Sequence, residues 1–270
     1  MPEGDTITKL ARFLDQALSG QRLRAVRLHP AFGPSAGAVR IQRISAHGKH
    51  LSIVFDNGHL LRSHLGLHGS WHRYRVGEPW RRPRRQLSLL LDASDWDYVC
   101  FNAKEIEWLK QGGFGLADRQ QHLGRDLIAQ PLDPASLLVR ARQLLTPATL
   151  LVDVLLDQRL AAGIGNVYKS ELLFLERYGP LTHLGALNDD DLLSLYRRAV
   201  TLLGANLGSG PRTTRFERDD RGSLWVYGRR DQPCLRSGAP LRRAIIGARP
   251  RSTYWCAHCQ QADTMAAMST

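Results

Sequence analysis

The stretch LLDQRLAAGIGNVYKSELLF, residues 155–174, carries the strongest structural signal in the chain. Its apolar spacing predicts a helix that ends near Ala162, a tight Gly-Ile-Gly turn, and a second helix that Asn166 is placed to cap. Glycines let a backbone approach a ligand closely, and the unpaired N–H groups of a helix N-terminus favour anions. The pattern therefore predicts a phosphate site, which Lys169 reinforces one turn later. The alternative is an ordinary helical hairpin in which glycine ends the first helix.

Apolar residues at helical spacing continue on both sides of this stretch. They predict helices in the segments 135–145, 148–160, 166–178 and 189–203. Asn188, followed by three aspartates, supplies an N-cap and the acidic residues that favour a helix N-terminus. Residues 205–223 are rich in glycine, serine and charge, which is typical of a loop. The sequence thus predicts a helical domain over about 122–205, followed by a loop.

The first 115 residues have a different pattern. A predicted helix from Thr6 to Leu18 places its apolar residues on one face. Short alternating or apolar runs follow, separated by turn signals such as Asn57-Gly58, which is typical of an antiparallel β-sandwich. Chain termini are usually mobile, but here the residues MPEG directly precede the helix. The helix therefore fixes the chain's first residues against a core.

The composition favours a polyanionic partner. The 270 residues contain 37 Lys and Arg against 25 Asp and Glu, so the net charge is +12 and the pI is near 10.1. This balance favours nucleic acid before a membrane surface, although GC-rich coding can also raise the arginine content without function. No apolar run is long enough to span a bilayer, and the N-terminus lacks a signal-peptide pattern. We therefore expect a cytoplasmic protein.

Three of the four cysteines cluster near the C-terminus, which in a reducing compartment suggests a metal site. They are Cys234, Cys256 and Cys259. A complete zinc site would read C-x2-C twice, but Ser237 occupies the second position. Zinc held by three thiolates with water or His258, a metal-free hairpin held by packing, and a simple substitution at this position all stay open. His258 lies inside the C-x2-C knuckle, where reaching the same metal is strained. Cys100 is predicted to be a small buried hydrophobe.

Five short motifs follow one another along nearly the whole chain. They are MPEG, HGKHL, HLGLHGSW, GIGNVYKSE and IIGARPRSTYWCAHCQ. In this order they resemble the N-terminal catalytic motif, β-hairpin lysine, intercalation loop, helix–two-turn–helix signature and zinc-finger hairpin of the formamidopyrimidine-DNA glycosylase and endonuclease VIII family. The glycine after Pro-Glu and the WCAHCQ ending resemble the endonuclease VIII branch more closely.

The resemblance implies an α+β fold in four parts. They are an antiparallel β-sandwich catalytic domain with an N-terminal helix (1–121), a helix–two-turn–helix DNA-binding domain (122–221), a zinc-finger-like β-hairpin module (222–262) and a tail (263–270). The resemblance also implies a structural zinc ion and a monomer in the nucleoid-associated cytoplasm, without membrane contact. The implied partner is double-stranded DNA with oxidised bases or abasic sites.

The resemblance further implies that the N-terminus is the active site. Once Met1 is removed, the secondary amine of Pro2 is a nucleophile that can attack a sugar C1′ and form an iminium. Glu3 would act as general acid and base. Lys49 would contact the scissile phosphate or assist proton transfer, whereas without the resemblance it would be a solvated hairpin lysine.

A base that leaves the duplex to reach Pro2 leaves a hole that an apolar side chain can fill. Leu67, with His68 beside it, is the candidate wedge because its flanking glycines favour a loop tip; the alternative is a core leucine in a strand. Phe114 is a candidate second strand-separating residue. The resemblance implies that Lys49, Asn166 and Arg251 contact phosphates around the flipped nucleotide, and Lys169 reinforces the same site. Arg249 lies so close to Arg251 that either could occupy the family's position. Without the resemblance, each of these residues would be interpreted as an ordinary surface residue.

The predicted function is a DNA glycosylase with abasic-site lyase activity. It would remove oxidised bases, pyrimidines by resemblance to the endonuclease VIII branch, and cleave the strand by β,δ-elimination through a Pro2 Schiff base. One alternative is the purine-directed branch, which acts on 8-oxoguanine and formamidopyrimidines. Another is a non-catalytic damaged-DNA-binding protein on the same scaffold, which Ser237 keeps open and the intact Pro2, Glu3 and Lys49 oppose.

Overall fold

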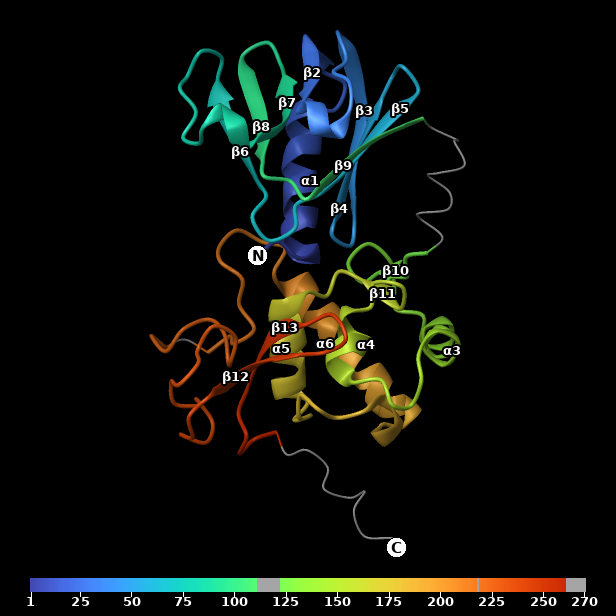
Figure 1. Ribbon diagram of the computed structural model, residues 1–270, viewed down its shortest axis with the longest axis vertical. Helices are drawn as coiled ribbons and strands as arrows, with labels where there is room; N and C mark the ends of the chain where they lie inside the picture. Colours follow the sequence, from blue (N-terminus) through green and yellow to red (C-terminus); the bar gives the residue numbers. More distant parts are fainter. Residues whose placement is uncertain (111–121, 218, 261–270) are drawn as a thin grey trace, which may run out of the picture. The chain divides into compact units, whose positions relative to one another are not determined.

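Figure 1 shows a computed structural model of the chain, in which residues 1–110, 122–217 and 219–260 are described. The chain divides into two compact units, Met1–His122 and Leu123–Thr270. Each unit is described by itself below. Phe114, the candidate second strand-separating residue, lies outside the described residues.

The first unit begins with helix α1 (Gly4–Leu18), which starts two residues before the predicted Thr6. Its buried face is formed by Ile7, Ala11, Leu14 and Leu18, at the spacing that the sequence predicts, and it packs against β3 and β4 (Figure 1). The Asp15 carboxylate also accepts a hydrogen bond from the backbone N–H of Ile44 at 2.7 Å. The helix is therefore fixed along its length.

Two antiparallel sheets form the rest of this unit. The five-stranded sheet has the order β1-β3-β4-β5-β9. Its strands are β1 (Arg22–Leu23), β3 (Val39–His47), β4 (His50–Phe55), β5 (His59–His64) and β9 (Glu105–Lys110). The four-stranded sheet has the order β2-β7-β8-β6. Its strands are β2 (Ala25–Leu28), β7 (Leu87–Asp92), β8 (Trp96–Phe101) and β6 (Ser70–Arg75).

The two sheets and α1 share one hydrophobic core. Phe55 and Leu61 enter it from the five-stranded sheet, and Leu89 and Cys100 enter it from the four-stranded sheet. Alternate residues of each strand face this core, as expected for a sandwich. The predicted antiparallel sandwich is confirmed. So is the burial of Cys100, where removal from water raises the pKa of the thiol.

The second unit is mainly helical. Its helices are α3 (Pro134–Leu144), α4 (Leu151–Leu156), α5 (Asn166–Leu175) and α6 (Asp189–Ala205). Asn188 caps α6 as predicted, by accepting from the backbone N–H of Asp191 at 2.9 Å. Tyr168 and Tyr196 are fully buried in the core between these helices, where the Tyr196 hydroxyl donates to the Val154 carbonyl at 3.2 Å.

The helix predicted to end near Ala162 ends at Leu156 instead. Ala161–Ala162 forms a short strand, β11, which pairs in parallel with β10 (Arg125–Asp126). The cause is Gln158, whose amide donates to the carbonyls of Leu156 and Ile164, each at 3.0 Å, and accepts from the Gly163 N–H at 3.1 Å. One side chain thus satisfies the backbone of the turn and replaces further helical hydrogen bonds.

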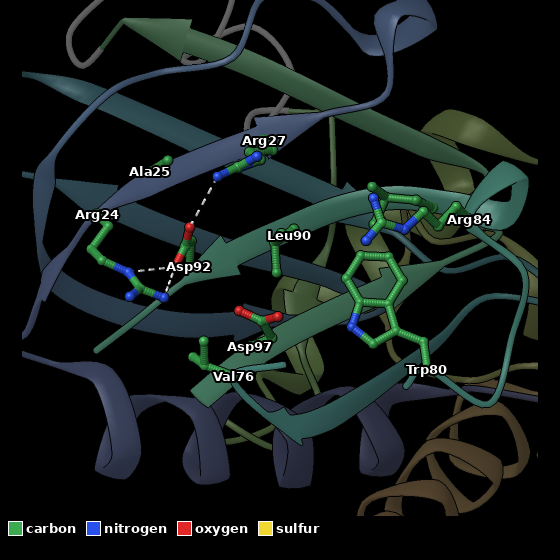
Figure 2. Close-up of a pocket in the computed structure, with 10 residues that line it drawn as sticks. Arg24, Ala25, Arg27, Val76, Trp80, Arg84, Leu90, Asp92 and Asp97 are labelled. Atoms are coloured by element: carbon green, nitrogen blue, oxygen red, sulfur yellow. Dashed lines mark hydrogen bonds and ion pairs between the residues drawn. The ribbon is translucent and has the colours of Figure 1, made fainter. Parts of the chain in front are cut away.

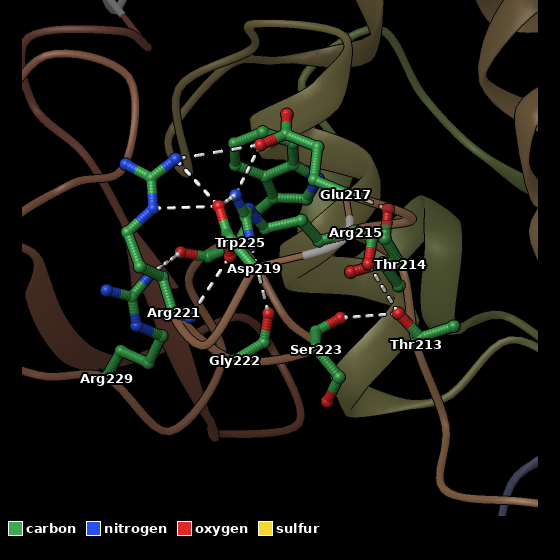
Figure 3. A network of polar contacts seen from close by, with 10 residues as sticks. All are labelled: Thr213, Thr214, Arg215, Glu217, Asp219, Arg221, Gly222, Ser223, Trp225 and Arg229. Atoms are coloured by element: carbon green, nitrogen blue, oxygen red, sulfur yellow. Dashed lines mark hydrogen bonds and ion pairs between the residues drawn. The ribbon is translucent and has the colours of Figure 1, made fainter.

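The loop after α6 is fixed by buried charge (Figure 3). The side chain of Arg215 is fully buried and bonds to the carboxylates of Glu217 and Asp219. Its guanidinium also lies 5.3 Å from the centre of the Trp225 ring. From α5, Glu171 accepts three successive backbone N–H bonds of residues 225–227 at 2.8, 2.9 and 2.7 Å. Ion pairs and hydrogen bonds to buried side chains therefore hold the described residues of this loop.

The described chain ends in a two-stranded hairpin of β12 (Arg242–Ile246) and β13 (Arg251–Trp255). The strand β13 packs against α5. Cys234 and Cys256 are buried with Phe174 of α5 in a small separate core. Across residues 1–110, 122–217 and 219–260, every helix is too short or too polar to cross a membrane.

Candidate active site

The first candidate site residues lie directly before α1. Glu3 is the N-cap residue of the helix and is fully buried, and its carbonyl accepts from the Ile7 N–H at 3.0 Å. Pro2 is half-buried. In the chain as written Met1 precedes Pro2, so the nitrogen of Pro2 is part of an amide. Packing of α1 against the sandwich thus fixes Pro2 and Glu3 in place, as the sequence predicts.

Lys49 lies in the two-residue turn between β3 and β4. His47 and His50 pair across this turn, and Gly48 has a φ of +54°, a conformation that favours glycine. The side chain of Lys49 is half-buried. The glycine therefore sets the turn that presents the lysine.

Beside Lys49 the structure brings together two histidines that the sequence alone does not connect. His50 and His64 face each other across β4 and β5, with ring centres 5.0 Å apart. Burial, reinforced by the Arg62 guanidinium, lowers the pKa of His50 to about 3. Burial also lowers the pKa of His64, although Glu105 opposes this shift. Both shifts favour the neutral form, which avoids repulsion between the two rings, and the rings meet at a tilt of 48°. Only the pairing of β4 with β5 brings them together.

Leu67 lies at the tip of the turn between β5 and β6, and its side chain is 58% exposed. The turn is closed by the Gly69 N–H, which donates to the Leu65 carbonyl at 3.0 Å. A second bond runs from the Gly66 N–H to Nδ1 of His64 at 3.2 Å. The alternative interpretation of Leu67 as a core leucine is therefore wrong. His68, beside it, is also exposed.

A separate pocket of about 610 Å³ lies on the four-stranded sheet of the first unit (Figure 2). Within it Arg24 and Arg27 bind the Asp92 carboxylate at 2.5 and 3.3 Å. Burial and the neighbouring Asp92 raise the pKa of Asp97. Nothing in the spacing of these residues connects them, so the sequence alone predicts no role for them.

In the second unit, Asn166 and Lys169 face the hairpin. Gly165 is the N-cap residue, and Asn166 is the first residue of α5, so the predicted capping role of Asn166 is wrong. Its amide donates to the Ser252 carbonyl at 2.8 Å. Lys169 is fully buried, and its ammonium donates to Oδ1 of Asn166 and to Oγ1 of Thr253, each at 2.7 Å. The prediction that Lys169 reinforces a phosphate site is therefore corrected: its charge binds the protein's own hairpin.

Arg251 is exposed at the start of β13, and its guanidinium donates to the Pro250 carbonyl at 3.0 Å. The preceding turn, residues 247–250, approaches the end of α4. There burial acts to raise the pKa of Asp157, but hydrogen bonds from Arg159 outweigh it and lower that pKa, and the charge of Arg249 adds to the lowering. One arginine, Arg249, thus lies within the turn of the hairpin, and Arg251 directly follows it.

The three clustered cysteines meet in space. The sulfur atoms of Cys234, Cys256 and Cys259 lie within 4.8 Å of one another. Ser237 completes the group, with its Oγ 3.3 Å from the Cys256 sulfur. His258 is exposed. Three soft sulfur ligands with a hydroxyl at the fourth corner fit a thiophilic ion such as zinc.

Backbone N–H groups also change the acidity of a thiol in this cluster. Burial raises the pKa of Cys234, but N–H bonds from Ser237 and Arg236 outweigh that effect and lower it to about 7. Burial raises the pKa of Cys259 to about 11. Gln260 joins the second knuckle to the segment that follows α5: it accepts from the Cys256 N–H at 2.9 Å and donates to the Tyr178 carbonyl at 2.8 Å. The knuckles are therefore shaped by their own hydrogen bonds.

Comparison with known proteins gives matches over nearly the whole chain. The family model of the formamidopyrimidine-DNA glycosylase N-terminal domain matches residues 1–104, and that of the H2TH domain of the same enzymes matches residues 123–218. "Probable endonuclease 8 2" of Streptomyces coelicolor is 37% identical over 96% of this chain and 94% of that protein. "DNA-(apurinic or apyrimidinic site) lyase Nei2" of Mycolicibacterium smegmatis is 34% identical over 97% of this chain and its own full length.

Solved structures share the fold. A formamidopyrimidine-DNA glycosylase of Lactococcus lactis, bound to DNA that contains an abasic site, has a TM-score of 0.81 at 21% identity. The match covers 96% of this chain and 100% of that one. Fold, sequence and the separated motifs agree. The chain therefore belongs to the formamidopyrimidine-DNA glycosylase and endonuclease VIII family of DNA repair glycosylases.

Proposed function

We propose that this chain is a bifunctional DNA glycosylase and abasic-site lyase that removes oxidised pyrimidines. The observation that carries the proposal is the placement of Pro2 and buried Glu3 directly before α1, in a chain that belongs to a family of such enzymes. The relatives named endonuclease 8 support the pyrimidine branch. The net charge of +12 suits a DNA partner in the nucleoid-associated cytoplasm.

The chemistry begins with removal of Met1, which converts the Pro2 amide into a secondary amine. The nitrogen attacks C1′ of the damaged nucleotide, the C1′–base bond breaks, and the base leaves with a proton. The C1′–O4′ bond then breaks, O4′ takes a proton, and the nitrogen lone pair forms a double bond to C1′. The resulting iminium makes the C2′ proton acidic, so its loss expels the 3′ phosphate, and a second elimination expels the 5′ phosphate. Glu3 supplies and accepts the protons at the sugar, for which its fixed position is suited.

The remaining site residues would hold the opened duplex. Leu67 would fill the space that the flipped base leaves, with His68 beside it, because an exposed apolar side chain at a loop tip can enter the stack. Lys49, Asn166 and Arg251 would contact phosphates. A bent and opened substrate needs such contacts from several directions.

We also propose that Cys234, Cys256 and Cys259 hold a structural zinc ion, with the Ser237 hydroxyl or water at the fourth position. Zinc would cross-link the two knuckles that carry the hairpin. Ser237→Cys would complete a four-sulfur site, so we expect zinc affinity to rise by at least about tenfold, measured by competition with a chelator. Zinc contents near zero in both the parent protein and Ser237→Cys would contradict a metal site.

Borohydride trapping on abasic DNA tests the nucleophile. Reduction of the iminium leaves a stable covalent adduct, which we expect from protein whose Met1 has been removed. The matched control carries an N-terminal extension that keeps the Pro2 nitrogen in an amide, and it should give no adduct. Equal trapping by both proteins, or none by the processed protein, would refute the mechanism; the second result is what a non-catalytic binding protein would give.

Two further assays refine the proposal. Glu3→Gln should lower the rate of base removal by about 10²- to 10⁴-fold, the usual contribution of general acid–base catalysis. Duplexes that carry an oxidised pyrimidine or 8-oxoguanine, assayed side by side, test the substrate class. Preference for the purine lesion would place the chain in the other branch of the family.

A further inference from the structure

The β12–β13 hairpin is a short ribbon that needs support from outside. Isolated two-stranded hairpins are only marginally stable in water. Here five residue pairs form the ribbon, from Arg242 with Trp255 to Ile246 with Arg251. Arg251 stands at the mouth of the turn, so any sliding or bending of the ribbon moves its guanidinium directly.

The turn of the hairpin is bound by Asp153 of α4. The backbone N–H of Ala248 donates to both carboxylate oxygens, at 3.0 and 2.9 Å. Gly247 has a φ of +102°, and a Cβ at this position would lie 2.6 Å from Oδ1 of Asp153. The backbone of the turn therefore lies so close to the Asp153 carboxylate that a side chain at position 247 would clash with it.

The strand β13 is bound by Lys169 of α5. The ammonium donates to Oγ1 of Thr253 at 2.7 Å and to the carbonyl of Ser252 at 3.2 Å. Both Lys169 and Thr253 are fully buried. A buried ammonium requires acceptors, so Lys169 constrains the two residues that directly follow Arg251.

We propose that Asp153 and Lys169 are positioning residues for DNA binding: one binds the turn and the other the strand, and between them they aim Arg251 at the phosphate backbone. The proposal rests on the proposed function, in which Arg251 contacts DNA. A side chain held before binding loses less conformational freedom on binding. Neither residue needs to touch DNA for this effect.

Net charge and the proposed positioning role predict opposite effects of Asp153→Ala on DNA binding, so this variant distinguishes between them. Removing an acidic residue from a chain of net charge +12 should, by charge alone, tighten binding to DNA. The proposal predicts the opposite for Asp153→Ala, because the turn loses its acceptor. Asp190→Ala, which removes the same charge from the exposed first turn of α6, is the matched control.

The experiment measures affinity for a labelled duplex with a reduced abasic site, which cannot be cleaved, between about 50 and 200 mM salt. We expect Asp153→Ala to weaken binding by about tenfold and to lower the slope of log affinity against log salt by about one, the signature of one lost phosphate contact. Asp190→Ala should bind as tightly as the parent protein or more so. At saturating protein, the rate of borohydride trapping by Asp153→Ala should match that of the parent.

Two further variants connect the effect to Arg251. Asp153→Asn keeps one acceptor oxygen and should restore part of the affinity. In the double variant Asp153→Ala, Arg251→Ala, the two losses should not add, since both remove the same contact. Lys169→Met should show the same reduced salt slope as Asp153→Ala, provided it is measured below its melting temperature.

The outcomes separate this inference from the proposed function. If the parent protein fails to bind or trap abasic DNA, the proposed function is wrong. If the parent does both, but Asp153→Ala binds as tightly as Asp190→Ala with an unchanged salt slope, only the positioning role is refuted. Full additivity with Arg251→Ala would likewise exclude action through that arginine.

Discussion

The Leu67 turn and the β12–β13 hairpin both present an exposed side chain on a short connection, but different forces hold them. The Leu67 turn is closed by backbone bonds and by glycines that allow close approach. The hairpin is bound by buried or half-buried charged side chains from α4 and α5. In the first case the exposed side chain of Leu67 is separate from the bonds that stabilise the turn. In the second, the residues next to Arg251 also stabilise the unit.

The largest loss of stability should follow removal of the buried charge of Lys169, which binds the hairpin. Lys169→Met keeps an apolar stem but leaves Oδ1 of Asn166 and Oγ1 of Thr253 without their donor. We expect the free energy of unfolding to fall by about 3 kcal/mol, since buried polar groups that lose a partner are costly. Urea denaturation measures it. A loss below about 0.5 kcal/mol would mean that this network contributes little stability.

Next comes the glycine that closes the Leu67 turn. In Gly69→Ala the new Cβ would lie 2.4 Å from the Leu65 carbonyl oxygen, so the backbone must shift. We expect a loss of about 2 kcal/mol in stability and a parallel loss of base removal. Gly37→Ala is the matched control, because its φ, like that of Gly69, is outside the left-handed region, and nothing lies within 4 Å of the added Cβ. Equal losses in both would show that close approach to the Leu65 carbonyl is not what acts at Gly69.

The histidine pair adds a pH dependence to the same region. The pKa of His50 is about 3 in the folded chain against 6.5 unperturbed, so the unfolded chain binds the proton more readily. The stability that neutral His50 contributes is therefore present above pH 6.5 and is lost as the pH falls from 6.5 towards 3. One such group changes the unfolding free energy by up to about 1.4 kcal/mol per pH unit. Unfolding of His50→Gln, measured from pH 7 to 5, should show a shallower slope than the parent, whereas His258→Gln, at an exposed position, should match it.

The smallest change in stability should follow loss of Leu67, the proposed wedge. Leu67→Ala removes a side chain that is 58% exposed, so the melting temperature should hardly change. Base removal should fall by about tenfold, because the opened stack loses the group that fills it. A matched truncation at another exposed position, Leu181→Ala, should leave base removal unchanged. A strong loss of stability in Leu67→Ala would show that this side chain also stabilises its turn. The contrast between the Leu67 turn and the β12–β13 hairpin would then be wrong.

The helices and the sandwich could be predicted because they are local patterns. Ile7, Leu14 and Leu18 recur at helical spacing, and burial follows from that spacing. The end of α4 could not be predicted in this way. Leu160 to Ala162 suit a helix equally well, and only the bonds of Gln158 to the turn show that the chain has already left it.

The candidate site divides along the same line. Motifs named Pro2, Glu3, Lys49 and Leu67, and the structure places each of them on the helix end or turn expected from its neighbours. The sequence correctly predicts the helix that contains Lys169, but it does not predict the buried environment of the Lys169 side chain. A lysine in a polar segment usually faces water, and only the packing of β13 on α5 buries it.

The sequence by itself determined the family, the order of elements and the residues at the N-terminus, because these depend on motifs and periodicity that lie within short stretches. Tertiary structure alone decided the contacts between distant stretches. It brought Ser237 beside Cys256, His50 beside His64, and Asp153 beside Ala248. Such pairs have no signature in spacing, because chain packing and the need to satisfy buried polar groups select them after the local elements have formed.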